Sequence, residues 1–157
     1  MPTYIVKAPP GLTAAQKSTI AQAITDRHHE ATGAPRFFAQ VVIEEDGPAQ
    51  ERHLGGVPAA SANTKGHIWV HGNIRSGRSK SVKETLALSI MRDIAQIADL
   101  NEAFVWVYLS EIAPTNMVEY GRVLPPPGGE EDWFASLPYE LAAQLESMGT
   151  TRGNFVL

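Results

Sequence analysis

The amino-acid sequence contains no cysteine among its 157 residues. Disulfide bridges, thiol nucleophiles and thiolate metal ligands are therefore excluded. Basic residues are also few: 13 Lys and Arg stand against 17 Asp and Glu, and the net charge of −4 argues against a nucleic-acid partner. No run approaches the ~20 apolar residues that a membrane-spanning helix needs.

The N-terminus has no basic segment followed by an apolar run, so no secretory signal is expected and a cytoplasmic protein is predicted. His28 and His29 are adjacent and so point to different sides of a helix, which argues against a catalytic metal site. The remaining composition is ordinary, with 43% hydrophobic residues. It predicts one domain over 1–157 with a core of its own.

Two segments of the chain show the same order of strand, helix and strand. The predicted elements are 3–8, 12–33 and 36–45 in the first segment, and 67–73, 81–100 and 103–112 in the second. The sequence therefore predicts two β-α-β repeats, over about 2–45 and 66–112, and a C-terminal tail over 113–157.

Both predicted helices begin with a capping-box pattern. Thr13 is followed three residues later by Gln16, and Ser81 is followed three residues later by Glu84. A helix between two strands implies a parallel crossover. The repeats thus predict an α+β fold in which a four-stranded sheet carries two helices on one face. The other face needs a cover, which predicts an oligomer.

Two segments lie outside the repeats. Residues 46–66 form a long loop rich in Gly, Pro and Ala, of the kind that often has a function. The tail contains the rigid break LPPPGG over 124–129, and the acidic residues after it suit a helix N-terminus.

The loop HGNIRSGRS follows a predicted strand and precedes a predicted helix, and it carries Arg75 and Arg78. Two guanidinium groups beside a helix N-terminus would bind a carboxylate or a phosphate. The alternative is a pair of solvated surface arginines.

Three further side chains are candidates for chemistry. His28 continues the helical face of Ile20 and Ile24 and points toward the sheet, as a core histidine also would. Glu119 lies in the turn-like stretch NMVEYGR, as a general base or an ordinary surface carboxylate. Tyr108 lies in a predicted strand, where aromatic side chains usually pack.

Pro2 directly follows the initiator methionine at the start of a predicted strand. Proline is tolerated there because a missing N–H matters little at a strand's first residue. Removal of Met1 would instead leave a secondary amine, and a free α-amine has a pKa of about 7.7–8.0. Nearby arginines would disfavour its cationic form and a nearby carboxylate would favour it.

Taken together, these residues resemble the tautomerase superfamily, and the chain is most similar to the cis-3-chloroacrylic acid dehalogenase family. The stretches AITDRHHEATG, WVHGNIRSGRS and NMVEYGRVLPPPG carry the resemblance. It implies a homotrimer without a cofactor, with a small carboxylate as substrate. It also implies the following site: Pro2, Tyr108 and Glu119 as catalytic residues and His28, Arg75 and Arg78 as substrate-binding residues.

The resemblance implies hydration of a 3-substituted acrylate. The arginines and His28 would hold the carboxylate, Glu119 with Tyr108 would activate water, and cationic Pro2 would protonate C2. With a 3-chloro group the product would collapse to malonate semialdehyde. Two alternatives stay open: a keto–enol tautomerase of phenylpyruvate-like substrates with Pro2 as base, and a carboxylate-binding module without catalysis. The loop over 46–66 is longer than is usual in the family.

Overall fold

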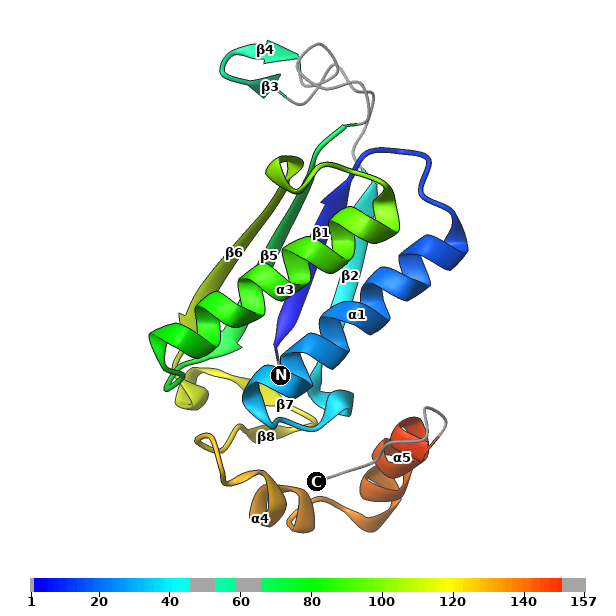
Figure 1. The fold of residues 1–157 in the computed structure, drawn as a ribbon. Helices are drawn as coiled ribbons and strands as arrows, with labels where there is room; N and C mark the ends of the chain where they lie inside the picture. Colours follow the sequence, from blue (N-terminus) through cyan, green and yellow to red (C-terminus); the bar gives the residue numbers. More distant parts are fainter. Residues whose placement is uncertain (1, 46–52, 59–65, 151–157) are drawn as a thin grey trace.

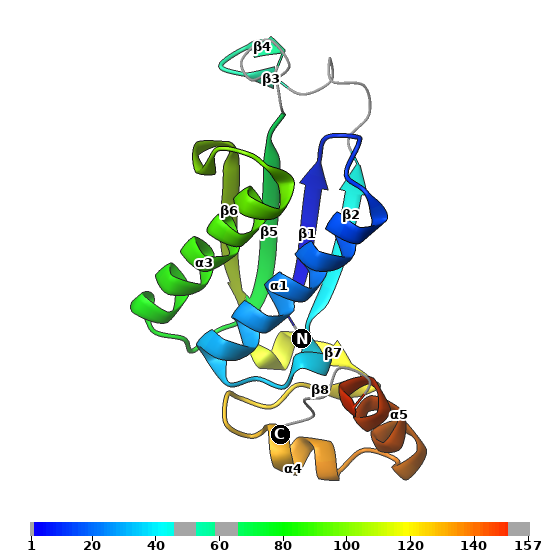
Figure 2. The same cartoon turned by 45° about the vertical axis from the view of Figure 1, so that its right-hand side comes forward.

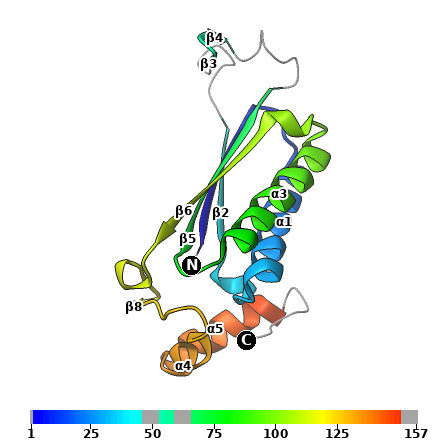
Figure 3. The same ribbon diagram turned by 60° about the vertical axis from the view of Figure 1, so that its left-hand side comes forward.

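A computed structural model describes residues 2–45, 53–58 and 66–150 of the chain. Its centre is a four-stranded sheet with the strand order β2-β1-β5-β6 (Figure 1). The strands are β1 Thr3–Ala8, β2 Gln40–Glu45, β5 Ile68–Arg75 and β6 Val105–Ile112. Helices α1 (Ala14–Thr32) and α3 (Lys80–Ala98) cover one face of this sheet, and no helix of the described residues covers the other face (Figure 3).

The topology follows the predicted repeats. β1 pairs with β2 in parallel, β5 pairs with β6 in parallel, and β1 and β5 join the two units in antiparallel pairing. Each helix therefore lies in a crossover between parallel strands. The predicted α+β class and the placement of both helices on one face are confirmed.

The start of α1 follows its predicted capping pattern. The Thr13 side chain accepts from the Gln16 backbone N–H, and the Gln16 side chain accepts from the Thr13 backbone N–H. The helix is capped by Gly33, whose φ of 71° glycine adopts more readily than residues with a Cβ. α1 and α3 are joined by Arg27, which donates from Nε to Asp93 Oδ2 at 2.7 Å.

The predicted start of the second helix was wrong by two residues. Ser79, not Ser81, is the N-cap of α3, because its Oγ accepts from the Val82 backbone N–H. Ser81 lies in the first turn, where its Oγ hydrogen-bonds with Ser79 Oγ at 3.0 Å. The spacing alone favoured Ser81 because Glu84 follows it, but Glu84 forms an ion pair with Lys80.

The main core lies between the sheet and the two helices. Tyr4, Val6, Ile24 and Ile90 are among its fully buried members. Gly72 allows the closest approach in this core, since a Cβ there would lie 2.4 Å from a ring carbon of Tyr4. The open face of the sheet contrasts with it: Trp106 is 41% and Tyr108 51% exposed.

The C-terminal part lies across the end of the sheet at which β1 begins (Figure 2). It comprises the two-stranded ladder of β7 (Val118–Glu119) and β8 (Arg122–Val123), then α4 (Glu130–Ala135) and α5 (Tyr139–Thr150). A second hydrophobic cluster holds it in place, with the buried members Phe38, Leu124, Trp133, Phe134, Leu137 and Leu145.

Three local expectations differ from the structure. Arg36–Phe38 form a 3-10 turn before β2, and Glu102–Phe104 form one before β6, where the predicted strands already began. A further 3-10 turn, Pro114–Asn116, lies in the tail, where no element was predicted. The predicted loop 46–66 contains a short hairpin over 53–58, in which β3 (His53–Leu54) pairs with β4 (Val57–Pro58). Residues 46–52 and 59–65 lie outside the described residues. No helix in the described part is long and apolar enough to cross a membrane.

Candidate active site

A small pocket lies at the end of the sheet where β1 begins. Its lining residues come from β1's entry, α1, the turn before β2 and the end of β5 with the loop after it: Pro2, His28, Ala34, Phe38, Ile74, Arg75 and Arg78. Four of the six residues that the sequence nominated thus meet in one pocket. Its cationic and imidazole groups suit an anion better than a metal cation.

Pro2 is buried at the start of β1. Its carbonyl oxygen accepts from the Gln40 N–H at 2.9 Å, which extends the pairing of β1 with β2 by one bond. Because Pro2 precedes the first residue of β1, its missing N–H removes no hydrogen bond from the sheet. Pro2 also lines the pocket. Met1 lies outside the described residues.

His28 lies in the pocket wall and is 5% exposed. Burial lowers the pKa of His28 to about 3, helped by the positive charges of Arg78 and Arg75. The imidazole is therefore neutral at ordinary pH. Its Nδ1 lies 2.7 Å from the hydroxyl of Tyr4, which is fully buried.

The direction of the Tyr4–His28 hydrogen bond follows from burial. Burial raises the pKa of Tyr4 above its usual value, so the hydroxyl keeps its proton. Among the described residues, His28 is the one hydrogen-bond partner of the Tyr4 hydroxyl. An undonated buried O–H would cost roughly 1–3 kcal/mol, so Tyr4 donates to Nδ1. The imidazole proton of His28 then sits on Nε2.

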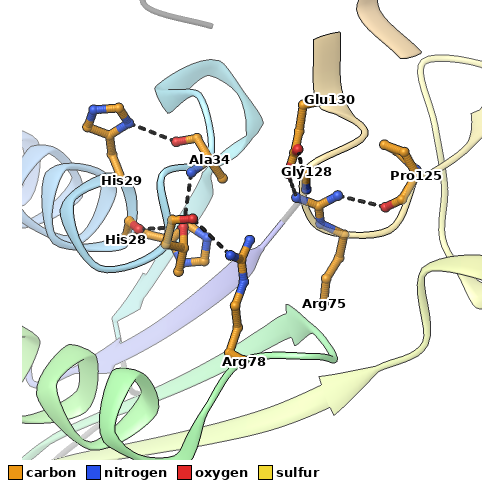
Figure 4. Close-up of polar contacts among 9 residues, drawn as sticks. His28, His29, Ala34, Arg75, Arg78, Pro125, Gly128 and Glu130 are labelled. Atoms are coloured by element: carbon orange, nitrogen blue, oxygen red, sulfur yellow. Dashed lines mark hydrogen bonds and ion pairs between the residues drawn. The ribbon is translucent and has the colours of Figure 1, made fainter. Parts of the chain in front are cut away.

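Arg78 donates from Nη1 to the carbonyl oxygen of Thr32 at the C-terminal end of α1, at 2.8 Å (Figure 4). Burial lowers the pKa of Arg78 and Arg75 lowers it further, while Glu130 acts in the opposite direction. An arginine in this state remains charged at ordinary pH.

Arg75 is the more deeply buried arginine, and its side chain is 8% exposed. Its Nη2 forms a short ion pair with Glu130 Oε1, and its Nη1 donates to the Pro125 carbonyl oxygen at 2.7 Å (Figure 4). The Gly128 N–H donates to the other carboxylate oxygen of Glu130 at 2.7 Å. Burial acts to raise the pKa of Glu130, but the bonds from Arg75 and Gly128 outweigh it and lower the pKa.

Tyr108 and Glu119 do not line this pocket within the chain. Tyr108 lies on the open face of the sheet, edge-on to Trp69 with ring centroids 5.9 Å apart. It pairs in register with His71, four residues or about 13 Å along β5 from Arg75. Glu119 is half-buried in β7, opposite Arg122.

Sequence reasoning did not identify Tyr4 or Glu130 as residues of the site. Tyr4 alternates with Val6 and Ala8 on the buried face of β1, so its pattern is that of a core residue. Glu130 was noted only as part of an acidic helix start. Its position after the rigid prolines was the available signal, because such a segment can fix a carboxylate against a partner far away in the chain.

Comparisons with known proteins show which family the chain belongs to. A family model described as "Putative oxalocrotonate tautomerase enzyme" matches residues 1–136. The crystal structure of N1, described as a member of the cis-3-chloroacrylic acid dehalogenase family, is 36% identical with a TM-score of 0.85, over 92% of this chain and 99% of that one. The chain belongs to this dehalogenase family of the tautomerase superfamily. The resemblance stated from the sequence is confirmed.

More distant structures share the fold. An asymmetric trimer of a fused 4-OT is 25% identical with a TM-score of 0.69, over 77% of this chain and 94% of that one. Macrophage migration inhibitory factor of Toxoplasma gondii is 13% identical with a TM-score of 0.64, over 78% and 99%. No curated protein matches the chain.

Proposed function

We propose that this protein is a cofactor-free hydratase that dehalogenates a short 3-substituted acrylate of the cis-3-chloroacrylate type. The observation that carries the proposal is the pocket in which Pro2, His28 and the two arginines meet. Membership of the cis-3-chloroacrylic acid dehalogenase family supports the same chemistry.

Substrate binding follows from the hydrogen-bond donors of the pocket. Arg78 and the Nε2–H of His28 donate to the substrate carboxylate, with Arg75 beside them as a third group. A neutral histidine contributes a donor without adding charge. Positive charge at the carboxylate draws electron density from the double bond and stabilises the charge that develops when C3 is attacked.

The chemical step adds water across the double bond. The Glu119 carboxylate, assisted by the Tyr108 hydroxyl, takes a proton from water, and the hydroxide oxygen bonds to C3. The ammonium of Pro2, free after removal of Met1, gives its proton to C2. The resulting 3-chloro-3-hydroxypropanoate loses chloride and a proton and becomes malonate semialdehyde.

This mechanism requires a second copy of the chain. Tyr108 is exposed on the open face of its own sheet and lies away from its own pocket. A homotrimer that packs these open faces would bring Tyr108 of one subunit to a neighbour's site and bury the exposed Trp106. A structural relative is itself described as a trimer.

A keto–enol tautomerase acting on phenylpyruvate-like substrates is the second candidate. Phe38 favours it, because this aromatic side chain lines the pocket and packs on Trp133 with ring centroids 5.2 Å apart. An aryl group would find an apolar wall there. Pro2 would then act as the base that moves the proton, and no water would be activated.

The variant Glu119→Gln separates the two candidates. It removes the base that activates water, so chloride release from cis-3-chloroacrylate is expected to fall by about 100-fold or more. Ketonisation of phenylpyruvate, which needs no activated water, is expected to stay within about threefold. Glu102→Gln, an exposed change away from the pocket, is the control. Equal loss of both activities in folded Glu119→Gln protein would contradict the assignment of Glu119.

A further inference from the structure

Arg75 lines the pocket, and its ion pair with Glu130, which lies behind the lining residues, is not explained by the proposed mechanism. Both side chains are nearly enclosed, at 8% and 14% exposure. The two residues are far apart in the chain, and they meet because α4 packs through Trp133 against Phe38 and the Trp133 indole N–H donates to the Val123 carbonyl oxygen at 2.9 Å. The pair is therefore held by the fold and is not an incidental surface contact.

Glu130 is fixed from both sides. One carboxylate oxygen binds the Arg75 guanidinium and the other accepts from the Gly128 N–H (Figure 4). Arg75 is fixed in turn, because its second terminal nitrogen donates to the Pro125 carbonyl oxygen. The pair cannot separate without leaving buried charges unpaired, so the fold keeps Arg75 neutralised.

Arg78 differs from Arg75 in its partners. Its hydrogen bond is to a carbonyl oxygen, that of Thr32, and no carboxylate within residues 2–45, 53–58 and 66–150 is paired with it. Glu130 attracts it only at longer range. His28 is neutral and adds no charge. In the proposed mechanism the positive charge of the Pro2 ammonium is balanced by the negative charge of the Glu119 carboxylate. One positive charge of the pocket, that of Arg78, is left to meet a substrate.

We propose that Glu130 determines the charge of the accepted substrate: by neutralising Arg75 it restricts the pocket to carboxylates with a single negative charge. This inference rests on the proposed function in so far as a carboxylate binds here. A dicarboxylate would place its second charge in an enclosed site whose other arginine already has a carboxylate, and Glu130 would repel it. Glu130 thus acts through Arg75 as a positioning and specificity-determining residue.

The experiment compares two ligands that differ in one group. cis-But-2-enoate and maleate share a cis double bond and a carboxylate, and maleate carries a second carboxylate where the other has a methyl group. Dissociation constants are measured by isothermal titration calorimetry at pH 8 with the full chain. The variants are Glu130→Gln and, as control, Glu131→Gln, which makes the same change at the exposed neighbouring residue.

The wild-type protein and Glu131→Gln are expected to bind cis-but-2-enoate at least about tenfold more tightly than maleate. Glu130→Gln frees the charge of Arg75, so maleate affinity is expected to rise about tenfold or more while cis-but-2-enoate affinity changes by less than about threefold. An equal change for both ligands, or no change for maleate in folded protein, would overturn the proposal. So would a wild-type protein that binds neither ligand.

A second variant tests the same charge balance if Glu130→Gln fails to fold. Arg78→Gln removes the arginine that is not neutralised, and it is expected to weaken cis-but-2-enoate binding by about 30-fold or more. Retained binding would show that Arg75 is available despite Glu130 and would overturn the proposal. The experiment measures binding and not turnover. A wild-type protein that binds the monocarboxylate but releases no chloride would therefore refute the proposed function and leave the proposal for Glu130 standing.

Discussion

The hydroxyl of Tyr4 lies 2.7 Å from Nδ1 of His28, and both side chains are buried. This bond connects the central sheet to the pocket, because Tyr4 belongs to β1 and His28 to α1. The hydroxyl determines which ring nitrogen carries the proton. His28, which lines the pocket, consequently carries its imidazole proton on Nε2 before any substrate arrives.

Tyr4→Phe tests this arrangement. Without the hydroxyl, Nδ1 has no donor and both tautomers of the neutral imidazole become populated, so KM for a carboxylate substrate is expected to rise about tenfold. Nitrogen-15 NMR of the imidazole reports the tautomer directly. Tyr139→Phe is the control, since Tyr139 is 86% exposed. A Tyr4→Phe protein with unchanged tautomer and unchanged KM would refute the role given to Tyr4.

The pH dependence of stability tests the burial of His28. Burial and the neighbouring arginines lower the pKa of His28 to about 3 in the folded protein, against about 6.5 in the unfolded chain. Between these values only the unfolded chain binds the proton. The free energy of unfolding therefore falls as pH is lowered from about 6.5 toward 3, by at most about 1.4 kcal/mol per pH unit. Above pH 6.5 His28 contributes no slope.

Urea unfolding between pH 5 and pH 7.5 measures this slope. His28→Gln is expected to reduce it, because glutamine does not titrate. His53→Gln, a change at an exposed histidine, is expected to leave the slope as it is. An undiminished slope in His28→Gln would show that other groups cause it.

The N-terminal amine of Pro2 can be tested by insertion of one alanine between Met1 and Pro2. The insertion converts the Pro2 nitrogen into an amide without basicity, so turnover is expected to fall by at least about 100-fold. Pro2→Ala keeps an α-amine but loses the ring, and an intermediate rate is expected. Intact-mass measurement establishes whether Met1 is removed in each protein. Full turnover by the insertion variant would exclude Pro2 as the proton donor.

The sequence predicted those parts of the fold that depend on local patterns. Thr13 and Gln16 specify the start of α1 because both halves of the capping box lie within one turn. The same rule misplaced the start of α3, where Ser79 and Ser81 compete within one turn and the backbone path decides between them. The strand predicted over 3–8 has the bounds that β1 has in the structure.

The candidate site was predictable only in part, for a physical reason. His28, Arg75 and Arg78 stand in recognisable motifs, and the structure brings them to one pocket with Pro2. The partners of these residues depend on tertiary contacts between distant segments. Neither the bond from Tyr4 to His28 nor the ion pair of Glu130 with Arg75 has a local signature. Tyr108 lies on the open face of its own sheet, and the role proposed for it depends on a second subunit.

The most direct test of the proposed function is chloride release from cis-3-chloroacrylate by purified protein whose intact mass confirms the loss of Met1. Chloride and malonate semialdehyde are expected in equal amounts, with a kcat/KM above that for phenylpyruvate ketonisation. Rapid ketonisation of phenylpyruvate without any release of chloride would contradict it and assign Pro2 the role of a base.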